Sequence, residues 1–195
     1  MEAGTIGGHA LEFDDDSHTY LVDGIIVPSI TQMIGSRFKH KYDGVKTETL
    51  REAARKGTEV HEAVERYAIL GEDSELPEVR GFKFLQKHYG FKVVEAEKQV
   101  ILFDDIPIAA GRFDLTLELN GEIGGADIKR TAALDREYLA LQLNLYRIAY
   151  LQTYGKEWKF LCGIHLRENV RKFVEIPINE ELTKQFIKEW RETYE

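Results

Sequence analysis

The chain has 195 residues, 43% of them hydrophobic, and carries a formal net charge of -8. The length suits one domain with a sizeable core, and the acidic balance argues against a protein that coats nucleic acid through bulk positive charge, although it leaves room for a local basic groove. The single cysteine, Cys162, excludes an internal disulfide and any four-cysteine zinc or iron–sulfur site carried by this chain alone.

The first elements predicted along the chain are a β-hairpin and a short helix. The segment "HTYLVDGIIVPSITQMIG" alternates around Asp23-Gly24, a two-residue hairpin signal, and Pro28-Ser29 then opens an apolar helix. The stretch "SRFKHKYDG" is polar, basic and interleaved with aromatic residues, which predicts an exposed loop.

Two helices are predicted next. The segment from Thr47 has helix-forming composition and ends before Gly71, so we expect one long helix, with Gly57 as the point where it could break. Pro77 suits the first turn of a second helix, which runs to about residue 89 and closes at Gly90.

Three strands follow, with short turns at Asp104-Asp105 and Asn120-Gly121, and their spacing allows antiparallel pairing. A helix over about 135–154 comes next, and then two strands and a C-terminal helix capped by Asn179. The predicted order of the core is helix, three strands, helix, strand. We expect a single domain over 1–195, with the N-terminal hairpin and helices at about 11–70, the core at about 77–168 and a last strand and helix at about 170–195.

Two carboxylates and a lysine stand out in the strands. Asp127 and Lys129 are two residues apart on a strand and therefore share a face, and Asp114 can lie beside Asp127 across the hairpin. Carboxylates that close repel each other unless they share a proton or a divalent cation. These residues alone leave two interpretations open, a metal site and a solvated ion pair at the sheet edge.

Two helices carry further candidates. Gly57, His61 and Glu65 fall on one stripe of the long helix, and the missing side chain at Gly57 would let a substrate approach His61 closely. Gln142 and Tyr146 share a face of an otherwise apolar helix, where the alternative is a buried amide–phenol hydrogen bond.

Taken together and in this order, these residues resemble the PD-(D/E)XK nuclease superfamily, in particular its RecB-like and phage exonuclease branch. The pattern in that branch is a helical His after Gly-Thr, an Asp, (Asp/Glu)-x-Lys and Gln-x-x-x-Tyr. The matching positions here are Gly57-Thr58, His61, Asp114, Asp127 with Lys129, and Gln142 with Tyr146. The resemblance implies an α/β restriction-endonuclease-like αβββαβ core, in which helices flank a central mixed sheet, with an N-terminal β-hairpin in addition.

The chain departs from the family pattern at two places. Phe113 stands where the superfamily name has proline, and Asp127 replaces the more frequent glutamate, which shortens its reach by one methylene. The relatives with an iron–sulfur cluster need four cysteines, so this chain resembles the members without one, such as the lambda-type exonucleases.

The resemblance implies a role for each candidate in phosphodiester hydrolysis. Mg²⁺ or Mn²⁺ would be held by His61, Asp114, Asp127 and the backbone carbonyl of Ile128. Glu97, on the preceding strand, would bind a second metal ion through water or, alternatively, form part of an exposed strand face. The catalytic residues would be Lys129, Asp114, Asp127, Gln142 and Tyr146. Lys129 would position or deprotonate the attacking water, and the glutamine and tyrosine would orient the lysine or touch the substrate.

Basic residues near these positions are candidates for nucleic-acid binding. The loop combines Arg37, Lys39 and Lys41 with Phe38 and Tyr42, a mixture suited to phosphates and base stacking, although it could equally be a solvated loop. The remaining candidates for phosphate contact, which flank the proposed metal site, are Arg55, Lys56 and Arg130.

The expected function is that of a metal-dependent DNA exonuclease in recombination, repair or phage DNA processing. A structure-selective endonuclease and a non-catalytic nucleic-acid-binding protein with the same fold are the alternatives. The resemblance is compatible with a homo-oligomer and with a single-strand annealing or recombination protein as partner. Because no apolar run approaches the roughly 18 residues of a membrane span, we expect a soluble, intracellular protein. The resemblance implies the cytoplasm of a bacterial or phage-infected cell.

Overall fold

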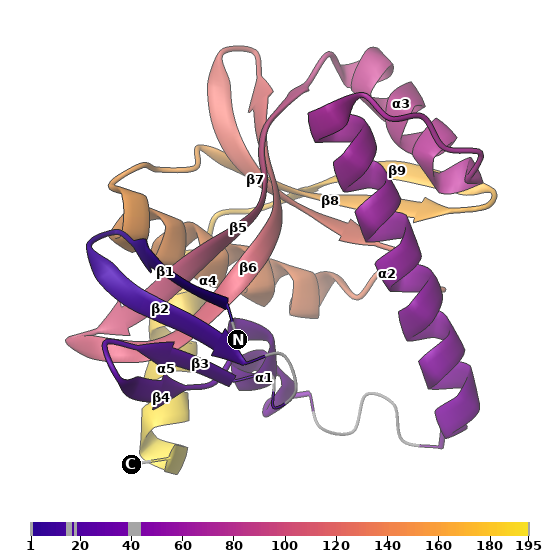
Figure 1. Ribbon diagram of the computed structural model, residues 1–195. Coiled ribbons are helices and arrows are strands. Elements are labelled where there is room, and N and C mark those ends of the chain that lie inside the picture. The colour runs from indigo at the N-terminus through magenta and orange to yellow at the C-terminus, as the bar shows by residue number, and fades with distance from the viewer. Residues whose placement is uncertain (1, 15–16, 18, 39–43, 195) are drawn as a thin grey trace.

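The computed structural model describes residues 2–14, 17, 19–38 and 44–194, which form two β-sheets and five helices (Figure 1). The strands are β1 (Glu2–Ile6), β2 (His9–Asp14), β3 (Thr19–Val22), β4 (Ile25–Val27), β5 (Lys92–Asp104), β6 (Ile106–Leu119), β7 (Glu122–Lys129), β8 (Phe160–Arg167) and β9 (Val170–Ile176). The helices are α1 (Ile30–Gly35), α2 (Thr47–Leu70), α3 (Pro77–Tyr89), α4 (Arg136–Tyr154) and α5 (Glu180–Tyr194). None of the described helices is long and apolar enough to cross a membrane.

The larger sheet is mixed and has the order β5-β6-β7-β8-β9. Its neighbouring strands are antiparallel except for β7 and β8, which run parallel. Parallel neighbours need a long connection, and α4 supplies it between these two strands. The predicted mixed sheet flanked by helices is therefore confirmed at this level of description.

Helices cover both faces of the larger sheet (Figure 1). On one face, α2 and α3 bury Val64 and Phe82 against residues such as Leu115 of β6. On the other face, α1, α4 and α5 form a second core with side chains such as Phe113 and Trp158. The central strands therefore contribute side chains to a core on each face of the sheet. The α2 helix packs against β5.

The helix boundaries follow from local chemistry, as the sequence predicted. Ser29 begins α1 with a capping box, because its hydroxyl accepts a hydrogen bond from the amide of Gln32 and the Gln32 side chain accepts one from the amide of Ser29. The helices α2, α3 and α4 each end at a left-handed glycine, namely Gly71, Gly90 and Gly155. The α2 helix runs through Gly57 without a break.

The N-terminal part is larger than the predicted hairpin. The hairpin of β3 and β4 is present, but β1 and β2 extend it to a four-stranded antiparallel sheet in which β2 pairs with both β1 and β3. The turn between β1 and β2 is Gly7-Gly8, where both residues have positive φ, and such a dipeptide is a hairpin signal in the sequence. This sheet packs through a third core, which includes Leu11 and Val22, on Ile101 of β5.

Candidate functional site

Three carboxylates lie at the same level on three neighbouring strands. The pairing of β5 with β6 on either side of Glu97 places that residue opposite Asp114. The pairing of β6 with β7, continued by one residue, places Asp114 opposite Asp127. Opposite residues on neighbouring strands project to the same side, so the sheet itself brings acidic groups together.

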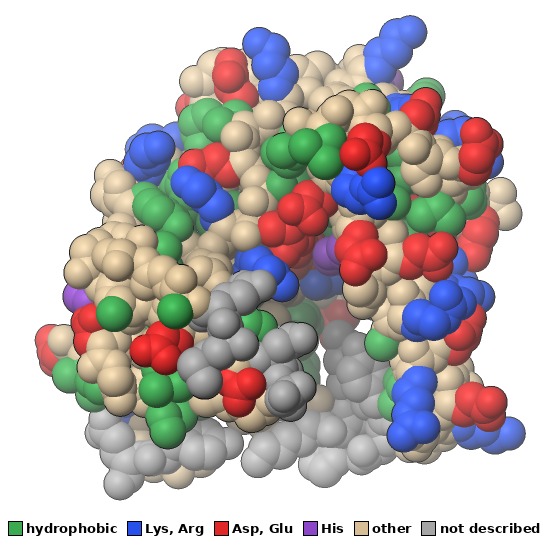
Figure 2. Space-filling view, in the orientation of Figure 1, with side chains coloured by type: hydrophobic (Ala, Val, Ile, Leu, Met, Phe, Trp, Pro, Cys, Tyr) green, Lys and Arg blue, Asp and Glu red, His purple; other side chains and the backbone are tan. Residues whose placement is uncertain are grey.

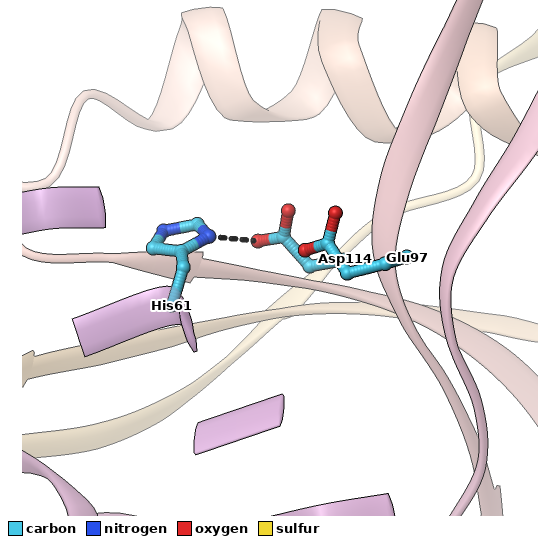
Figure 3. Close-up of side chains that lie close together, drawn as sticks. All are labelled: His61, Glu97 and Asp114. Carbon is cyan, nitrogen blue, oxygen red and sulfur yellow. Dashed lines mark ion pairs between the residues drawn. The ribbon is translucent and has the colours of Figure 1, made fainter. Parts of the chain in front are cut away.

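The α2 helix adds a histidine to this row. Nδ1 of His61 lies 3.4 Å from Oδ2 of Asp114. One ligand atom each from His61, Glu97 and Asp114 can be chosen such that all lie within 4.8 Å of one another (Figure 3). A nitrogen and two carboxylate oxygens at this separation could hold a single metal ion.

These three residues open into a pocket of about 630 Å³ between α2, the N-terminal sheet and the strands β5 and β6. Figure 2 shows acidic side chains gathered around a hollow in this face of the molecule, with a histidine among them. The predicted stripe of α2 faces the pocket, because Gly57, His61 and Glu65 all line it. Its other lining residues are Phe13, Tyr20, Ser29, Thr31, Thr58, Glu62, Glu97, Gly111, Arg112, Asp114 and Tyr146.

Asp114 is held in place by the backbone of the next strand. The ladder between β6 and β7 is paired as far as Leu115 and Ala126. Beyond that pair, Oδ2 of Asp114 accepts a hydrogen bond of 2.6 Å from the amide of Ile128. The carboxylate thus takes the place of a backbone acceptor, which fixes its orientation toward the pocket.

Asp127 and Lys129 form an ion pair beside Asp114. Nζ of Lys129 lies 2.6 Å from Oδ2 of Asp127, whose side chain is only 4% exposed. Neither Asp127 nor Lys129 is among the described residues that line the pocket. The structure therefore brings Asp114, Asp127 and Lys129 together as the sequence predicted, but the compact group around His61 contains Glu97 and not Asp127.

The pKa values of the two outer carboxyl groups are raised. Burial raises the pKa of Glu97 to about 7, and the charge of Asp114 adds to this effect. Burial likewise raises the pKa of Asp127 to about 6, although the positive charge of Lys129 opposes the shift. Negative charge is therefore crowded at this level of the sheet.

The histidine and the central carboxylate stabilise each other's charge. Burial disfavours the charged form of His61, but the charge of Asp114 and its hydrogen bond outweigh burial and raise the pKa of His61 to about 9. Burial also disfavours ionised Asp114, yet the pKa of Asp114 is held below its usual value by His61. Burial lowers the pKa of Lys129, but the charges of Asp127 and Asp114 raise it overall.

Glu97 has an unusual backbone conformation. Its φ is 50°, in the left-handed region that non-glycine residues seldom adopt. Its carboxylate forms an ion pair with Arg112, with Nε of the arginine 3.0 Å from Oε2 of Glu97. Strained residues of this kind cluster at binding and catalytic sites, and this conformation favours Glu97 as a site residue over a place on an exposed strand face.

Two charged residues of the pocket were given no role from the sequence. Arg112 lines the pocket and is 46% exposed at its side chain, and Glu65 also lines it. Strand alternation places Arg112 on the same side as Asp114, and Glu65 was already on the stripe of His61. Both could have been chosen from the sequence by these spacings.

Gln142 and Tyr146 do not form the amide–phenol pair that was the alternative to a catalytic role. The hydroxyl of Tyr146 donates a hydrogen bond of 3.1 Å to the carbonyl oxygen of Arg112, and its ring lies against Gly111. Gln142 is buried, and within the described part of the chain its Oε1 has no hydrogen-bond partner. Tyr146 reaches the pocket, so only one of the two lines it.

The basic residues predicted to contact nucleic acid have acidic partners where they are described. Arg37 lies 3.6 Å from Glu189, and both Arg55 and Lys56 pair with Glu52 of their own helix. Lys39, Lys41 and Tyr42 lie outside the described residues.

Arg130 has a different environment from the one predicted for a phosphate contact. Its side chain is 11% exposed and pairs with Glu78 at 2.8 Å and with Glu168 at 2.6 Å. A phosphate would have to displace both carboxylates, so the geometry favours a structural tie between α3 and the turn from β8 to β9.

The chain was compared with known families, curated proteins and solved structures. No family model and no curated protein matches the sequence. Among solved structures, the chain is similar to the crystal structure of SSO0001, with 12% sequence identity and a TM-score of 0.48 over 86% of this chain and 75% of that chain. At this similarity, nothing about substrate or chemistry transfers from that protein to this chain.

Proposed function

We propose that the protein is a divalent-metal-dependent deoxyribonuclease of the PD-(D/E)XK type that hydrolyses phosphodiester bonds at DNA ends. The observation that carries the proposal is the group of His61, Glu97 and Asp114, whose ligand atoms lie within 4.8 Å of one another beside the ion pair of Asp127 and Lys129. The order of α3, β5, β6, β7, α4 and β8 also agrees with the helix, three strands, helix, strand of that family's core.

The donor set fits a hard divalent cation. Glu97 and Asp114 lie opposite each other on the neighbouring strands β5 and β6. Burial and the charge of Asp114 raise the pKa of Glu97, and a bound cation would offset both effects. The imidazole of His61 is a nitrogen donor, which suits Mn²⁺ in particular, and Mg²⁺ accepts the two carboxylates. Asp127 lies opposite Asp114 on the neighbouring strand, and the amide of Ile128 donates to Asp114. Asp127 and the carbonyl of Ile128 would complete the ligands that the resemblance implies.

A bound cation would supply Lewis-acid stabilisation of the phosphate oxygens and of the departing 3'-oxygen. The residues of the chain would do the remaining work. Asp127 holds Nζ of Lys129 at 2.6 Å, so the ammonium group is fixed where it can orient the attacking water or stabilise charge on the phosphate. Asp114 is anchored by the amide of Ile128 and therefore keeps its place when substrate binds.

Arg112 would contact the substrate. Its guanidinium is exposed to the pocket and pairs with Glu97. If Glu97 held a cation, the guanidinium of Arg112 would be free of this partner and could bind a phosphate oxygen. Tyr146 supports this role because its hydroxyl holds the backbone carbonyl of Arg112.

The test is cleavage of labelled DNA by the purified protein. We expect hydrolysis of linear DNA with Mg²⁺ or Mn²⁺, none in excess chelator, and none after Asp114→Asn. Glu97→Gln is the informative variant, since it removes the charge of a ligand but keeps its shape, and it should weaken binding of Mn²⁺ measured by calorimetry. Glu59→Gln, on the same protein, serves as the control because Glu59 is not among the residues that line the pocket.

Two results would contradict the proposal. Absence of cleavage in any divalent metal, together with unchanged metal binding in Glu97→Gln and Asp114→Asn, would exclude a metal-dependent nuclease. Rapid cutting of covalently closed circular DNA into defined fragments would instead support an endonuclease, because an enzyme that needs ends leaves closed circles intact.

A further inference from the structure

A second surface of the molecule, which shares no residue with the lining of the pocket, combines exposed and half-buried aromatic rings with basic side chains. It is formed by one face of α3 and by β9, the edge strand of the larger sheet. Four rings follow one another across it, and we call them the aromatic strip: Phe84, His88, Tyr89 and Phe173.

The rings of the aromatic strip touch in sequence. Phe84 and His88 stack with centroids 5.7 Å apart, His88 meets Tyr89 at 4.9 Å, and Tyr89 stacks on Phe173 at 4.6 Å. Phe84 is 48% exposed and Tyr89 is 42% exposed. Isolated exposed aromatic residues are ordinary, but rings in continuous contact across two elements form an apolar surface that a partner could cover.

Positive charge lies along the same surface. The guanidinium of Arg171 stacks over Phe84 at 4.2 Å from the ring centroid. On α3, Arg80 and Lys87 fall within one helical stripe with Phe84 and His88. Among the residues that the structure describes, no carboxylate lies within ion-pair distance of Lys87 or Arg171, whereas Arg80 has only the exposed Glu75 at 3.6 Å.

Close packing of the two elements fixes this arrangement. A Cβ atom at Gly81 of α3 would lie 3.3 Å from Cδ2 of Leu166 and 3.4 Å from Cβ of Arg171, so the glycine allows the helix to approach the edge of the sheet closely. Arg171 and Phe173 are two residues apart on β9 and project to the same side, toward α3. The rings and the guanidinium are thus presented from rigid elements and not from a loop.

We propose that this surface binds single-stranded nucleic acid. Aromatic faces stack on bases without regard to sequence, and cations beside them bind the phosphates between the bases. A duplex would not suit the aromatic strip, because its bases are already stacked and its edges alone are exposed. The basic side chains Arg80, Lys87 and Arg171 surround Phe84 on a protein with a net charge of -8, and Glu175, on the same side of β9, is the acidic exception. The local charge around Phe84 therefore complements a nucleic-acid strand and disfavours basic protein partners.

The proposal is independent of hydrolysis at the pocket and is tested by binding alone. The probe is a fluorescein-labelled oligothymidylate of about 15 nucleotides, enough to span one single-strand site, with anisotropy measured in excess chelator so that no cleavage intervenes. Phe84→Ala should weaken binding roughly tenfold, the scale of one lost stacking contact. Arg171→Ala should weaken binding and lower the log–log salt slope by about 0.7, the value for one phosphate contact on a single strand.

Matched variants separate stacking from damage to the fold. Phe84→Trp should retain binding, and Leu70→Ala, which removes an exposed apolar side chain at the end of α2, should leave it unchanged. Phe84→Ala should still bind Mn²⁺ at the pocket, as measured by calorimetry, so failure of the proposed metal site and failure of this surface give different results. Each variant should keep a cooperative thermal transition.

The proposal is overturned if Phe84→Ala and Arg171→Ala bind oligothymidylate as the unmodified protein does. It is also overturned if a duplex of equal length binds as tightly and loses the same affinity in Phe84→Ala. A change in sedimentation on Phe84→Ala without a change in oligothymidylate binding would identify the aromatic strip as a contact between copies of this chain instead.

Discussion

Glu97 shows how a single residue can carry both strain and charge at the site. Its left-handed backbone, at φ 50°, costs about 1–3 kcal/mol for a residue with a side chain. Its carboxylate is then brought against Asp114, where burial and repulsion raise its pKa to about 7. The backbone strain and the crowding of the carboxylates both destabilise the folded, metal-free protein. A cation bound between the carboxylates would offset the electrostatic repulsion.

The first prediction at the scale of residues concerns pH. The pKa of Glu97 rises from 4.5 to about 7 on folding and that of His61 from 6.5 to about 9, so the folded protein retains protons that the unfolded chain has released. Stability of the metal-free protein should therefore fall as pH rises through these two windows, from about 5 to 9.

Thermal unfolding in chelator and in Mn²⁺, followed over this pH range, checks the prediction. The stabilisation by Mn²⁺ should increase with pH, because the cation displaces protons from these ligands. For each proton released, the affinity for Mn²⁺ should rise at most about tenfold per pH unit. Glu97→Gln should reduce the fall of stability between about pH 5 and 7 and leave the parts that come from Asp127, whose pKa is raised to about 6, and from His61. A metal-free protein whose melting temperature rises from pH 5 to 9 would contradict the assignment of these groups.

Lys129 gives the second prediction. Lys129→Ala should leave Mn²⁺ and DNA binding largely in place and reduce turnover by about 10² or more, the scale of losing one charge contact in the transition state. Single-turnover cleavage and calorimetry on the same preparation measure both quantities. Near-normal turnover in the alanine variant would remove Lys129 from the chemistry. Lys159→Ala is a suitable control, since that lysine also lies two residues after an acidic residue and is exposed.

At the scale of elements, α2 has a glycine at a position where an alanine would make the helix more stable. Gly57 lies within α2 and lines the pocket, and a Cβ atom there would meet nothing within 4 Å. Glycine inside a helix costs roughly 0.5–1 kcal/mol relative to alanine. The absence of a side chain therefore serves neither packing nor helix stability.

Gly57→Ala is the prediction that follows for α2. The variant should be more stable by roughly 0.5–1 kcal/mol, because alanine is the better helix former. It should also cleave DNA more slowly, since the added methyl group projects into the pocket one turn from His61. Chemical denaturation and initial rates measure the two effects.

Gly81→Ala is the contrasting substitution in α3. Its methyl group would come within 3.3 Å of Leu166, so crowding should cancel the gain in helix propensity. Equal stabilisation in both variants would show that the close approach of α3 to β8 and β9 is not tight. Unchanged cleavage by Gly57→Ala would show that substrate does not approach α2 at this turn.

At the scale of the whole molecule, Arg130 joins parts of the chain that are far apart in sequence. It follows β7 and pairs with Glu78 of α3 and Glu168 of the turn between β8 and β9. The side chain of Glu78 is 3% exposed, so loss of its partner would leave a buried carboxylate without compensation.

Arg130→Ala should therefore lower the free energy of unfolding by about 3–5 kcal/mol, as measured by urea denaturation. Arg55→Ala is the control, because Arg55 pairs with Glu52 and Glu59 on an exposed helix face and its loss should change stability little. If Arg130→Ala kept its stability and lost DNA affinity instead, Arg130 would be the phosphate contact that the sequence alone suggested.

The sequence by itself determined the elements and most of the candidate residues. Turn and cap residues such as Ser29, Gly90 and Gly155 act within a few residues of chain, so the helices α1 to α4 were predictable from local chemistry. Strand alternation likewise placed Asp127 and Lys129 on one face, where the structure pairs them. The extra strands β1 and β2 were missed although their Gly7-Gly8 turn carried a local signal.

Only the tertiary structure decided which of these residues meet. Glu97 joins His61 and Asp114 because of the register between β5 and β6 and a positive φ, and neither is encoded by the pattern around Glu97 alone. Arg130 pairs with Glu78 and Glu168, which lie 52 and 38 residues away in the sequence. Local rules fix which face a side chain occupies, whereas its partner depends on contacts between distant segments, which form only when the two cores on either side of the sheet are packed.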